Sequence, residues 1–257
     1  MKCVLHIERL SVQYSSDKRR LALNEISLQI AQGEAFGLVG GSGSGKSTLV
    51  WSVLGLIQAR GGLILQGEIR FPMEEQPERY SPGRVALIPQ DPHAAFDPLF
   101  TIRNHFEEVI QLYKGNLPQK EKEALIEKFL KVCELSFSVQ DLKRYPHEFS
   151  GGEKQRFLIA LALIADPYLI VADEPTSSLD VTIQAEIMRL FEKIRRQNVS
   201  FLFITHHLLL AKQFSTRIAV LHEGKMVECE QVQKLFEHPQ HPYTQALIEA
   251  VCETPQR

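Results

Sequence analysis

Cysteine is scarce in this chain, and the few cysteines do not cluster. The four residues lie far apart, at Cys3, Cys133, Cys229 and Cys252. Since no two of them form a C-x-x-C pair, neither a zinc site nor a disulfide scaffold is indicated. Residues 1–4 also lack the basic and apolar regions of a secretory leader. We therefore expect reduced thiols in a cytosolic protein.

Long apolar runs and an excess of one charge are missing as well. No segment reaches the roughly 18 uninterrupted apolar residues of a membrane span. The nearest candidate, Phe157–Ala172, is interrupted by Asp166 and Pro167, so any contact with a membrane is expected to go through a partner. The 29 basic and 31 acidic residues leave a net charge of −2, which argues against a strongly basic nucleic-acid-binding protein. The 257 residues suffice for one large domain or for a core with an added lobe.

Glycine and serine, by contrast, are concentrated in residues 40–48, which read Gly-Gly-Ser-Gly-Ser-Gly-Lys-Ser-Thr. This segment fits the phosphate-binding pattern G-x-x-x-x-G-K-[ST], which arises by accident in roughly one chain in a hundred of this length. The apolar residues Ala35–Val39 before it predict a buried strand, and Leu49–Ile57 after it predict a helix. A flexible turn is the alternative, but the strand–loop–helix context favours a nucleoside triphosphate site.

The residue types of this loop suit phosphate chemistry. Glycines let successive backbone N–H groups curl around a phosphate at the positive end of the following helix. Lys46 would reach the β- and γ-phosphates, and the Ser47 hydroxyl would ligate Mg²⁺.

Two acids at the end of a second apolar strand fit the same chemistry. Leu169–Ala172 predicts a strand that Asp173 and Glu174 follow directly, and ligands bind beyond the carboxyl ends of strands in open α/β sheets. Asp173 is placed to hold Mg²⁺, directly or through water, and Glu174 to orient or deprotonate an attacking water. Two solvated acids at a strand end are the alternative, which the phosphate loop makes weaker.

A further anion site is predicted at the segment Phe149–Glu153. Ser150 is a candidate N-cap for a helix over Glu153–Ala165, and Glu153 has the spacing of a capping box. Simple capping explains much of this segment. Gly151 and Gly152 would also expose N–H groups at the positive end of the helix.

The remaining apolar patterns alternate between strand and helix periods. Further strands are predicted at Val4–Ile7, Ala22–Ile30, Glu68–Phe71, Val85–Ile88, Val199–Ile204 and Ile218–Leu221, and further helices at Lys120–Leu135 and Thr182–Arg196. Residues 92–150 lack strand signals and are expected to be mostly helical.

Taken together, these motifs resemble the ATP-binding cassette family, the ATPase subunits of ABC transporters, over nearly the whole chain and in the family's order. By this resemblance, residues 40–48 are the Walker A loop and Leu169–Asp173 is Walker B, followed by Glu174 as the catalytic glutamate. Gln90 matches the glutamine loop, which meets Mg²⁺ and senses a transmembrane partner.

Four further positions match the family's other motifs. Ser150–Glu153 matches the signature, Ser178-Leu179-Asp180 the D-loop, and His206 the switch histidine that contacts the γ-phosphate. Tyr14 lies where the family places an aromatic residue that stacks on adenine. The resemblance thus implies catalytic roles for Lys46, Glu174 and His206, Mg²⁺ ligands at Ser47, Gln90 and Asp173, and ATP contacts from Tyr14, Gly40, Gly41, Ser42, Gly43, Ser44, Gly45, Lys46, Ser47, Thr48, Gln90, Ser150, Gly151, Gly152, Glu153 and Asp180.

Two stretches narrow the resemblance to the ATPases of peptide and nickel importers. These are Gln90–Ile102, reading QDPHAAFDPLFTI, and Leu235–Val251, reading LFEHPQHPYTQALIEAV. In the second stretch, residues 238–242 predict a turn between two helices rather than a metal site. Some relatives carry an iron–sulfur centre in this tail, but Cys252 stands nearly alone, so we expect no cluster here.

The chain also departs from the family's pattern. Glu153 stands where the signature more often has Gln, His207 where Asp commonly follows the switch histidine, and Ser178 where Ala is commoner. Glu153 adds a carboxylate near the nucleotide, which the positive end of the helix could offset. His207 is expected to affect local hydrogen bonding and turnover rather than nucleotide binding, and to be structural.

The fold implied by the resemblance is α/β, with a P-loop NTPase (RecA-like) core, an N-terminal antiparallel β layer and an inserted α-helical subdomain. We expect one ABC ATPase domain over residues 1–257. Within it, residues 1–91 and 161–225 form the nucleotide-binding core with its β layer, 92–160 the helical signature subdomain, and 226–257 a C-terminal tail motif.

The activity implied is ATP hydrolysis that powers an importer for peptides, nickel or a metal–chelator complex. Two cassettes, self or sister, would sandwich ATP and Mg²⁺ head to tail on the cytoplasmic face of the inner membrane. The expected partners are integral membrane permease subunits and, indirectly, a solute-binding protein, with no nucleic acid. Two alternatives stay open: a soluble cassette ATPase acting on ribosomes or DNA, and a catalytically silent ATP-binding half of a heterodimer.

Overall fold

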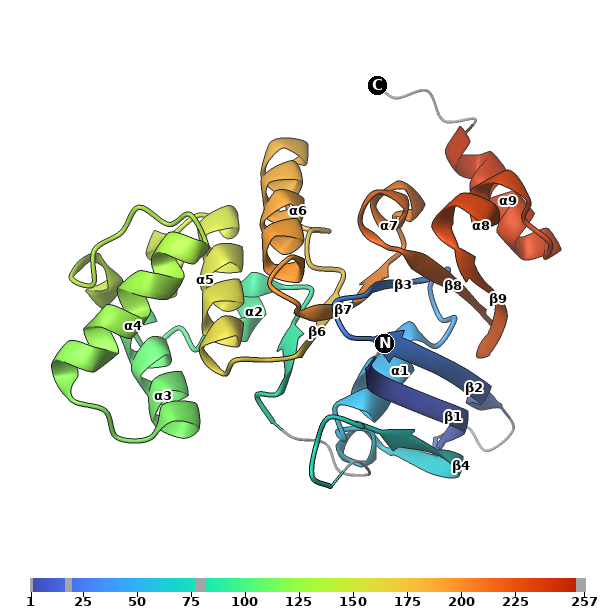
Figure 1. Ribbon diagram of the computed structural model, residues 1–257, viewed down its shortest axis with the longest axis horizontal. Coiled ribbons are helices and arrows are strands. Elements are labelled where there is room, and N and C mark those ends of the chain that lie inside the picture. Colours follow the sequence, from blue (N-terminus) through green and yellow to red (C-terminus); the bar gives the residue numbers. More distant parts are fainter. Residues whose placement is uncertain (1, 17–19, 77–81, 253–257) are drawn as a thin grey trace. The chain divides into compact units, whose positions relative to one another are not determined.

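A computed structural model describes residues 2–16, 20–76 and 82–252 of the chain, the last without its side chain. These residues form two compact units (Figure 1), one from residues 1–81 and 195–257 and the other from residues 82–194. The domain boundaries expected from the sequence stay a prediction.

The first unit contains two sheets and the phosphate-loop motif. Its elements are β1 (Cys3–Tyr14), β2 (Leu21–Ala31), β3 (Ala35–Val39), α1 (Lys46–Val53), a 3₁₀ turn (Gln58–Arg60), β4 (Gly62–Arg70), β7 (Ser200–Thr205), α7 (Leu208–Phe214), β8 (Arg217–His222), β9 (Lys225–Gln231), α8 (Val232–Glu237) and α9 (Pro242–Cys252). In the antiparallel sheet, β1 pairs with β2 on one side and with β4 on the other. Every second residue toward the end of β2 is buried, as in Ile26, Leu28 and Ile30, so one face of this sheet is packed.

The other sheet of the first unit is mainly parallel. β3 pairs in parallel with β7 and β8, and β9 joins the edge of β8 in antiparallel fashion. Every residue of β3 and β7 is buried. Such continuous burial is typical of parallel strands covered on both faces, and it confirms the buried strand predicted at Ala35–Val39.

The second unit holds a parallel strand pair and the helices of residues 92–150, a segment that the sequence predicted to be mostly helical. Its elements are β5 (Val85–Ile88), α2 (Pro92–Ala95), α3 (Ile102–Lys114), α4 (Gln119–Val132), 3₁₀ turns at Asp141–Lys143 and Pro146–Glu148, α5 (Gly151–Ile164), β6 (Leu169–Asp173) and α6 (Val181–Arg195). Phe157 of α5 is fully buried, and its ring lies 6.3 Å from Phe106, 5.8 Å from Phe137 and 5.0 Å from Phe149. This aromatic cluster forms the packed centre of the helical part.

The α/β class, the antiparallel layer and the helical segment are thus confirmed, while several element boundaries were wrong. The helix after the phosphate loop spans Lys46–Val53 instead of Leu49–Ile57, because Gly55 adopts φ 68° and leaves the helical region. β1 runs on to Tyr14, and β4 begins at Gly62. α5 ends at Ile164, as Asp166 and Pro167 predicted. None of the helices in the described part of the chain combines the length and the apolar composition that a bilayer crossing requires.

Strand β9 was missed altogether. It forms a hairpin with β8 through Glu223 and Gly224, whose φ angles are 47° and 76°. Two consecutive left-handed residues make the tight turn that suits the twist of a β-hairpin. The Glu-Gly dipeptide, with apolar residues resuming at Met226 after those that end at Leu221, was therefore a usable signal.

The C-terminal helices α8 and α9 flank the predicted turn at residues 238–241, and Glu228 of β9 fixes this turn. Its carboxylate accepts hydrogen bonds from the backbone N–H groups of Gln240 at 2.9 Å and His241 at 3.1 Å. Partial burial disfavours the charged carboxylate, but these hydrogen bonds outweigh it, so the pKa of Glu228 lies below its ordinary value.

We expect Glu228→Gln to lower the Tm by about 1–3 °C at pH 7. A group whose folded pKa is depressed stabilises the fold above its unfolded pKa, here near 4.5, and this contribution is lost as the pH falls through the folded value. The Tm difference between parent and variant should therefore shrink below pH 4.5. Thermal unfolding followed by circular dichroism at pH 7 and at pH 3–4 checks this. Glu230→Gln, which removes an exposed ion pair with Lys234, is the matched control. A pH-independent difference would contradict the role of Glu228.

Candidate functional site

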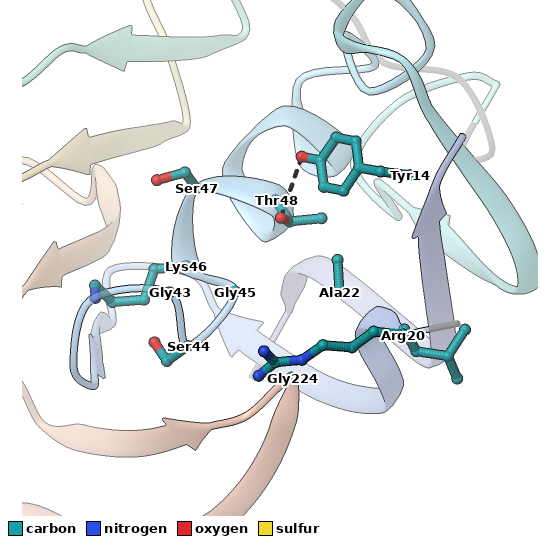
Figure 2. A pocket seen from close by; sticks show the side chains of 11 residues that line it. Tyr14, Arg20, Ala22, Gly43, Ser44, Gly45, Lys46, Ser47, Thr48 and Gly224 are labelled. Atoms are coloured by element: carbon teal, nitrogen blue, oxygen red, sulfur yellow. Dashed lines mark hydrogen bonds between the residues drawn. The ribbon is translucent and has the colours of Figure 1, made fainter. Parts of the chain in front are cut away.

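The phosphate-loop motif of the first unit folds into a tight turn between β3 and α1 (Figure 2). Gly43 and Gly45 have φ angles of 72° and 109°, a region that residues with a Cβ rarely adopt. Gly40 is required for a different reason, since a Cβ there would lie 2.3 Å from the carbonyl oxygen of Leu221. From Gly45 onward the helical hydrogen bonds begin, with Leu49 N–H donating to the Gly45 carbonyl at 3.0 Å. The sequence therefore forms a loop that ends at a helix N-terminus.

Lys46 folds back into this loop. Its side chain is only 8% exposed, and its Nζ donates to the carbonyl oxygens of Gly40 at 2.8 Å and Gly41 at 2.9 Å. A buried ammonium group has to be hydrogen-bonded, and here the loop's own carbonyls serve as acceptors. The positive charge is thereby held inside the curve of the loop, where a phosphate would bind.

The loop forms one wall of a cavity of about 300 Å³ within the first unit. Tyr14, at the end of β1, lines it together with Gly43–Thr48, and its hydroxyl lies 3.2 Å from Thr48 Oγ1 (Figure 2). An aromatic ring is thus available beside the phosphate loop, and its stacking on adenine stays a prediction. The Ser47 side chain is exposed.

No sequence pattern predicted the four further lining residues, which are Arg20, Leu21, Ala22 and Gly224. Gly224 comes from the turn of the missed β8–β9 hairpin, and its N–H donates to the Ser44 carbonyl at 2.9 Å. Recognition of the hairpin would have placed a tight turn in this sheet, but not against the phosphate loop.

In the second unit, the predicted glutamine loop and the acidic strand end meet. β5 and β6 are parallel, with Ile88 opposite Ala172, so Gln90 and Glu174 follow the strands at the same edge. Gln90 Nε2 donates to Glu174 Oε2 at 3.3 Å. Glu174 has a φ of 45°, unusual for a residue with a side chain, and such backbone strain concentrates at functional sites. Asp173, the last residue of β6, is partly buried.

The signature segment forms the N-terminus of α5 with a complete capping box. Ser150 Oγ accepts from Glu153 N–H at 3.3 Å, and a Glu153 carboxylate oxygen accepts from Ser150 N–H at 2.8 Å. Gly152 is needed for packing, because a Cβ there would lie 2.8 Å from Ile183. A Cβ on Gly151 would meet Leu179 at an ordinary 3.6 Å, so packing does not require glycine at that position.

A lysine–histidine contact joins the glutamine loop to the signature helix within the same unit. Lys154 Nζ lies 2.8 Å from Nδ1 of His93, and Lys154 is 3% exposed. Burial lowers the pKa of Lys154, and the nearby Asp91 only partly opposes this effect.

The D-loop and switch residues also have defined surroundings. Asp180 Oδ1 accepts from Ile183 N–H at 3.0 Å and so caps α6. His206 is exposed and follows β7 directly. His207 is the N-cap of α7, where its Nδ1 accepts from Leu210 N–H at 3.4 Å. His207 thus caps a helix, which is a structural role of the kind expected from the sequence.

The predicted site residues thus form two groups, each of which lies within one unit. The phosphate loop, Tyr14 and His206 belong to the first unit, while Gln90, Asp173, Glu174, the signature and Asp180 belong to the second. The hydroxyl of Ser47, the carboxylate of Asp173 and the amide oxygen of Gln90 are hard oxygen donors, so their chemistry fits Mg²⁺.

Two family models match the chain. "ABC transporter" covers residues 23–177, and "Oligopeptide/dipeptide transporter, C-terminal region" covers residues 227–257. Among curated relatives, the oligopeptide transport ATP-binding protein OppF of Streptococcus mutans is 36% identical over 98% of this chain and 82% of the relative. An uncharacterized ABC transporter ATP-binding protein of Escherichia coli, YejF, is 38% identical over 95% of this chain. The chain spans 48% of the length of that protein.

Solved structures show the same fold. CbiO1 of Clostridium perfringens, part of the ABC transporter complex CbiONQ, superposes with a TM-score of 0.77 at 24% identity, over 93% of this chain and 92% of that one. The ATP-binding cassette MJ0796, a dimer bound to ADP and Pi, gives a TM-score of 0.72 at 26% identity, over 89% and 98%. The strand–loop–helix phosphate site and the two matching family models lead to one conclusion: the chain belongs to the ABC transporter ATP-binding family and carries the C-terminal region of the oligopeptide/dipeptide transporters.

Proposed function

We propose that the chain is the ATP-hydrolysing subunit of an ABC importer for short peptides. The observation that carries this proposal is the phosphate loop closed around the buried Lys46, next to the cavity lined by Tyr14. The C-terminal region narrows the transport class, and the one relative named above for oligopeptide transport, OppF, favours a peptide over nickel.

The chain's own residues account for phosphoryl transfer to water, which depends mostly on positioning and charge stabilisation. Lys46 leaves the carbonyls of Gly40 and Gly41 and binds the β- and γ-phosphates. Ser47, Asp173 and Gln90 hold Mg²⁺, which when bound neutralises phosphate charge. Glu174 orients the attacking water and takes its proton, and the hydrogen bond from Gln90 orients the Glu174 carboxylate.

The second cassette of the sandwich is part of the proposal. The signature Ser150–Gly152 of one copy faces the ATP bound at the phosphate loop of the other. Gly151 supports this role, since packing within the described chain does not require glycine there, whereas close approach of a phosphate does. His206 contacts the γ-phosphate, and permease subunits in the inner membrane receive the resulting motion through the segment after Gln90.

A catalytically silent half of a heterodimer is the second candidate. Glu153 and His207 depart from the family pattern and are the residues that favour this candidate. Both side chains cap helices in the structure, so their presence has a structural explanation.

Mg-ATP hydrolysis by the purified chain over a concentration series tests the proposal. If two copies complete each site, the rate should rise more steeply than in proportion to protein concentration. No hydrolysis despite ATP binding would show that a sister subunit or the permease completes the site. Failure to bind Mg-ATP at all would contradict the proposal. Co-purification with membranes only when permease subunits are co-expressed would separate the importer from a ribosome- or DNA-directed ATPase.

A further inference from the structure

The C-terminal helices α8 and α9 have no role in the hydrolysis just described, yet they reach the phosphate loop. Leu235 of α8 and Ile248 of α9 belong to a buried cluster with Val39, Ile218 and Val220 of the parallel sheet. Val39 is the last residue of β3, directly before the loop. The tail therefore packs against the strand that carries the loop.

The side chain of Tyr243, at the start of α9, is held in one direction. The backbone N–H of Tyr243 donates to His241 Nδ1 at 3.1 Å, within the turn that Glu228 fixes. Its ring stacks on the ring of His222 at the end of β8, with the centroids 3.8 Å apart and the planes 23° apart. The first contact fixes the backbone at the start of α9, and the stacking orients the phenol ring.

The hydroxyl of this phenol contacts the phosphate loop. Gly41 N–H donates to Tyr243 Oη at 2.9 Å, across 202 residues of sequence. The carbonyl of the same peptide unit belongs to Gly40 and accepts from Lys46 Nζ at 2.8 Å. One peptide plane is thus held at both ends, by Tyr243 at its N–H and by Lys46 at its oxygen. Hydrogen bonds through a shared peptide group polarise and strengthen one another.

We infer that Tyr243 is a positioning residue for the phosphate loop, and that the C-terminal region serves as a brace for nucleotide binding. Without the hydroxyl, the N–H of the Gly40–Gly41 peptide loses its acceptor and the peptide can rotate. The ordered loop that a phosphate would meet is then only one of several conformations, which weakens binding. Only the consequence for ATP rests on the proposed function; the brace itself does not.

Tyr243→Phe tests the inference, because it removes only the hydroxyl and keeps the ring that stacks on His222. Two measurements are made on the full chain: amide hydrogen exchange without nucleotide, and the Kd for Mg-ATP. We expect faster exchange at residues 40–46, unchanged exchange at residues 244–250 of α9, and an ATP Kd about two- to tenfold higher, as for the loss of one neutral hydrogen bond. Tyr113→Phe on α3 is the matched control and should change neither measurement.

The outcomes separate the inference from the proposed function. Unchanged exchange at residues 40–46, or an unchanged Kd in a chain that binds ATP, would overturn the role of Tyr243. Faster exchange in α9 as well would also overturn it, because the tyrosine would then only stabilise its own helix. If the parent chain bound no ATP, the proposed function would fail, and the exchange at residues 40–46 would still decide whether the brace exists.

Discussion

Replacing Glu174 with glutamine is expected to abolish ATP turnover while ATP binding persists. The amide keeps the size of the side chain and an oxygen that can accept from Gln90, but it cannot take a proton from water. Loss of a general base lowers the rate by about 10²–10⁴-fold. Steady-state phosphate release and an ATP Kd, measured on the same preparation, check both parts.

Glu127→Gln, an exposed substitution on α4, is the control for Glu174→Gln and should leave hydrolysis unchanged. Because the sandwich would no longer be released by hydrolysis, Glu174→Gln should also shift the chain to an ATP-dependent dimer in size-exclusion chromatography. Hydrolysis at the parent rate in this variant would show that another group is the base.

Lys46→Ala is expected to weaken ATP binding by about 10- to 100-fold. The ammonium group is buried and points into the loop, so its loss removes charge-assisted bonds to phosphate that contribute about 1.5–3 kcal/mol. Titration calorimetry with Mg-ATP measures the change.

Lys46 also bonds to the loop carbonyls, so its removal could disturb the loop itself. Lys46→Met keeps the apolar stem and isolates the charge, and Lys114→Ala on α3 is an exposed lysine control. An ATP affinity equal to the parent's in Lys46→Met would remove the assignment of this loop as the phosphate site.

Local patterns predicted the parts of this fold that local forces determine. The loop at residues 40–48, the cap at Ser150 and the stop at Asp166-Pro167 each depend on a few neighbouring residues. The observed helix after the loop differs from the predicted one by three to four residues at its ends, and it stops before the left-handed Gly55. Strand β9 was not predicted, because its turn is a Glu-Gly pair and not the more familiar Asn-Gly.

The contacts that were not predicted join distant parts of the chain. Gly224 reaches Ser44, and Tyr243 reaches Gly41 across 202 residues. Nothing in the composition of either segment specifies its partner, since such pairs depend on how the sheet orders its strands. The tail motif containing Tyr243 was recognised only by its resemblance to the peptide and nickel importer ATPases. The fold shows that the hydroxyl of Tyr243 points to Gly41.

The cap of α5 has a consequence for assembly. Both of its hydrogen bonds are made within one chain, between Ser150 and Glu153. In the proposed sandwich, the surface that this loop would offer to a second cassette is therefore preorganised, and little conformational entropy would remain to be lost there when two copies meet. Encounter would be governed by diffusion and orientation of two rigid faces, with no folding step at this loop to slow it.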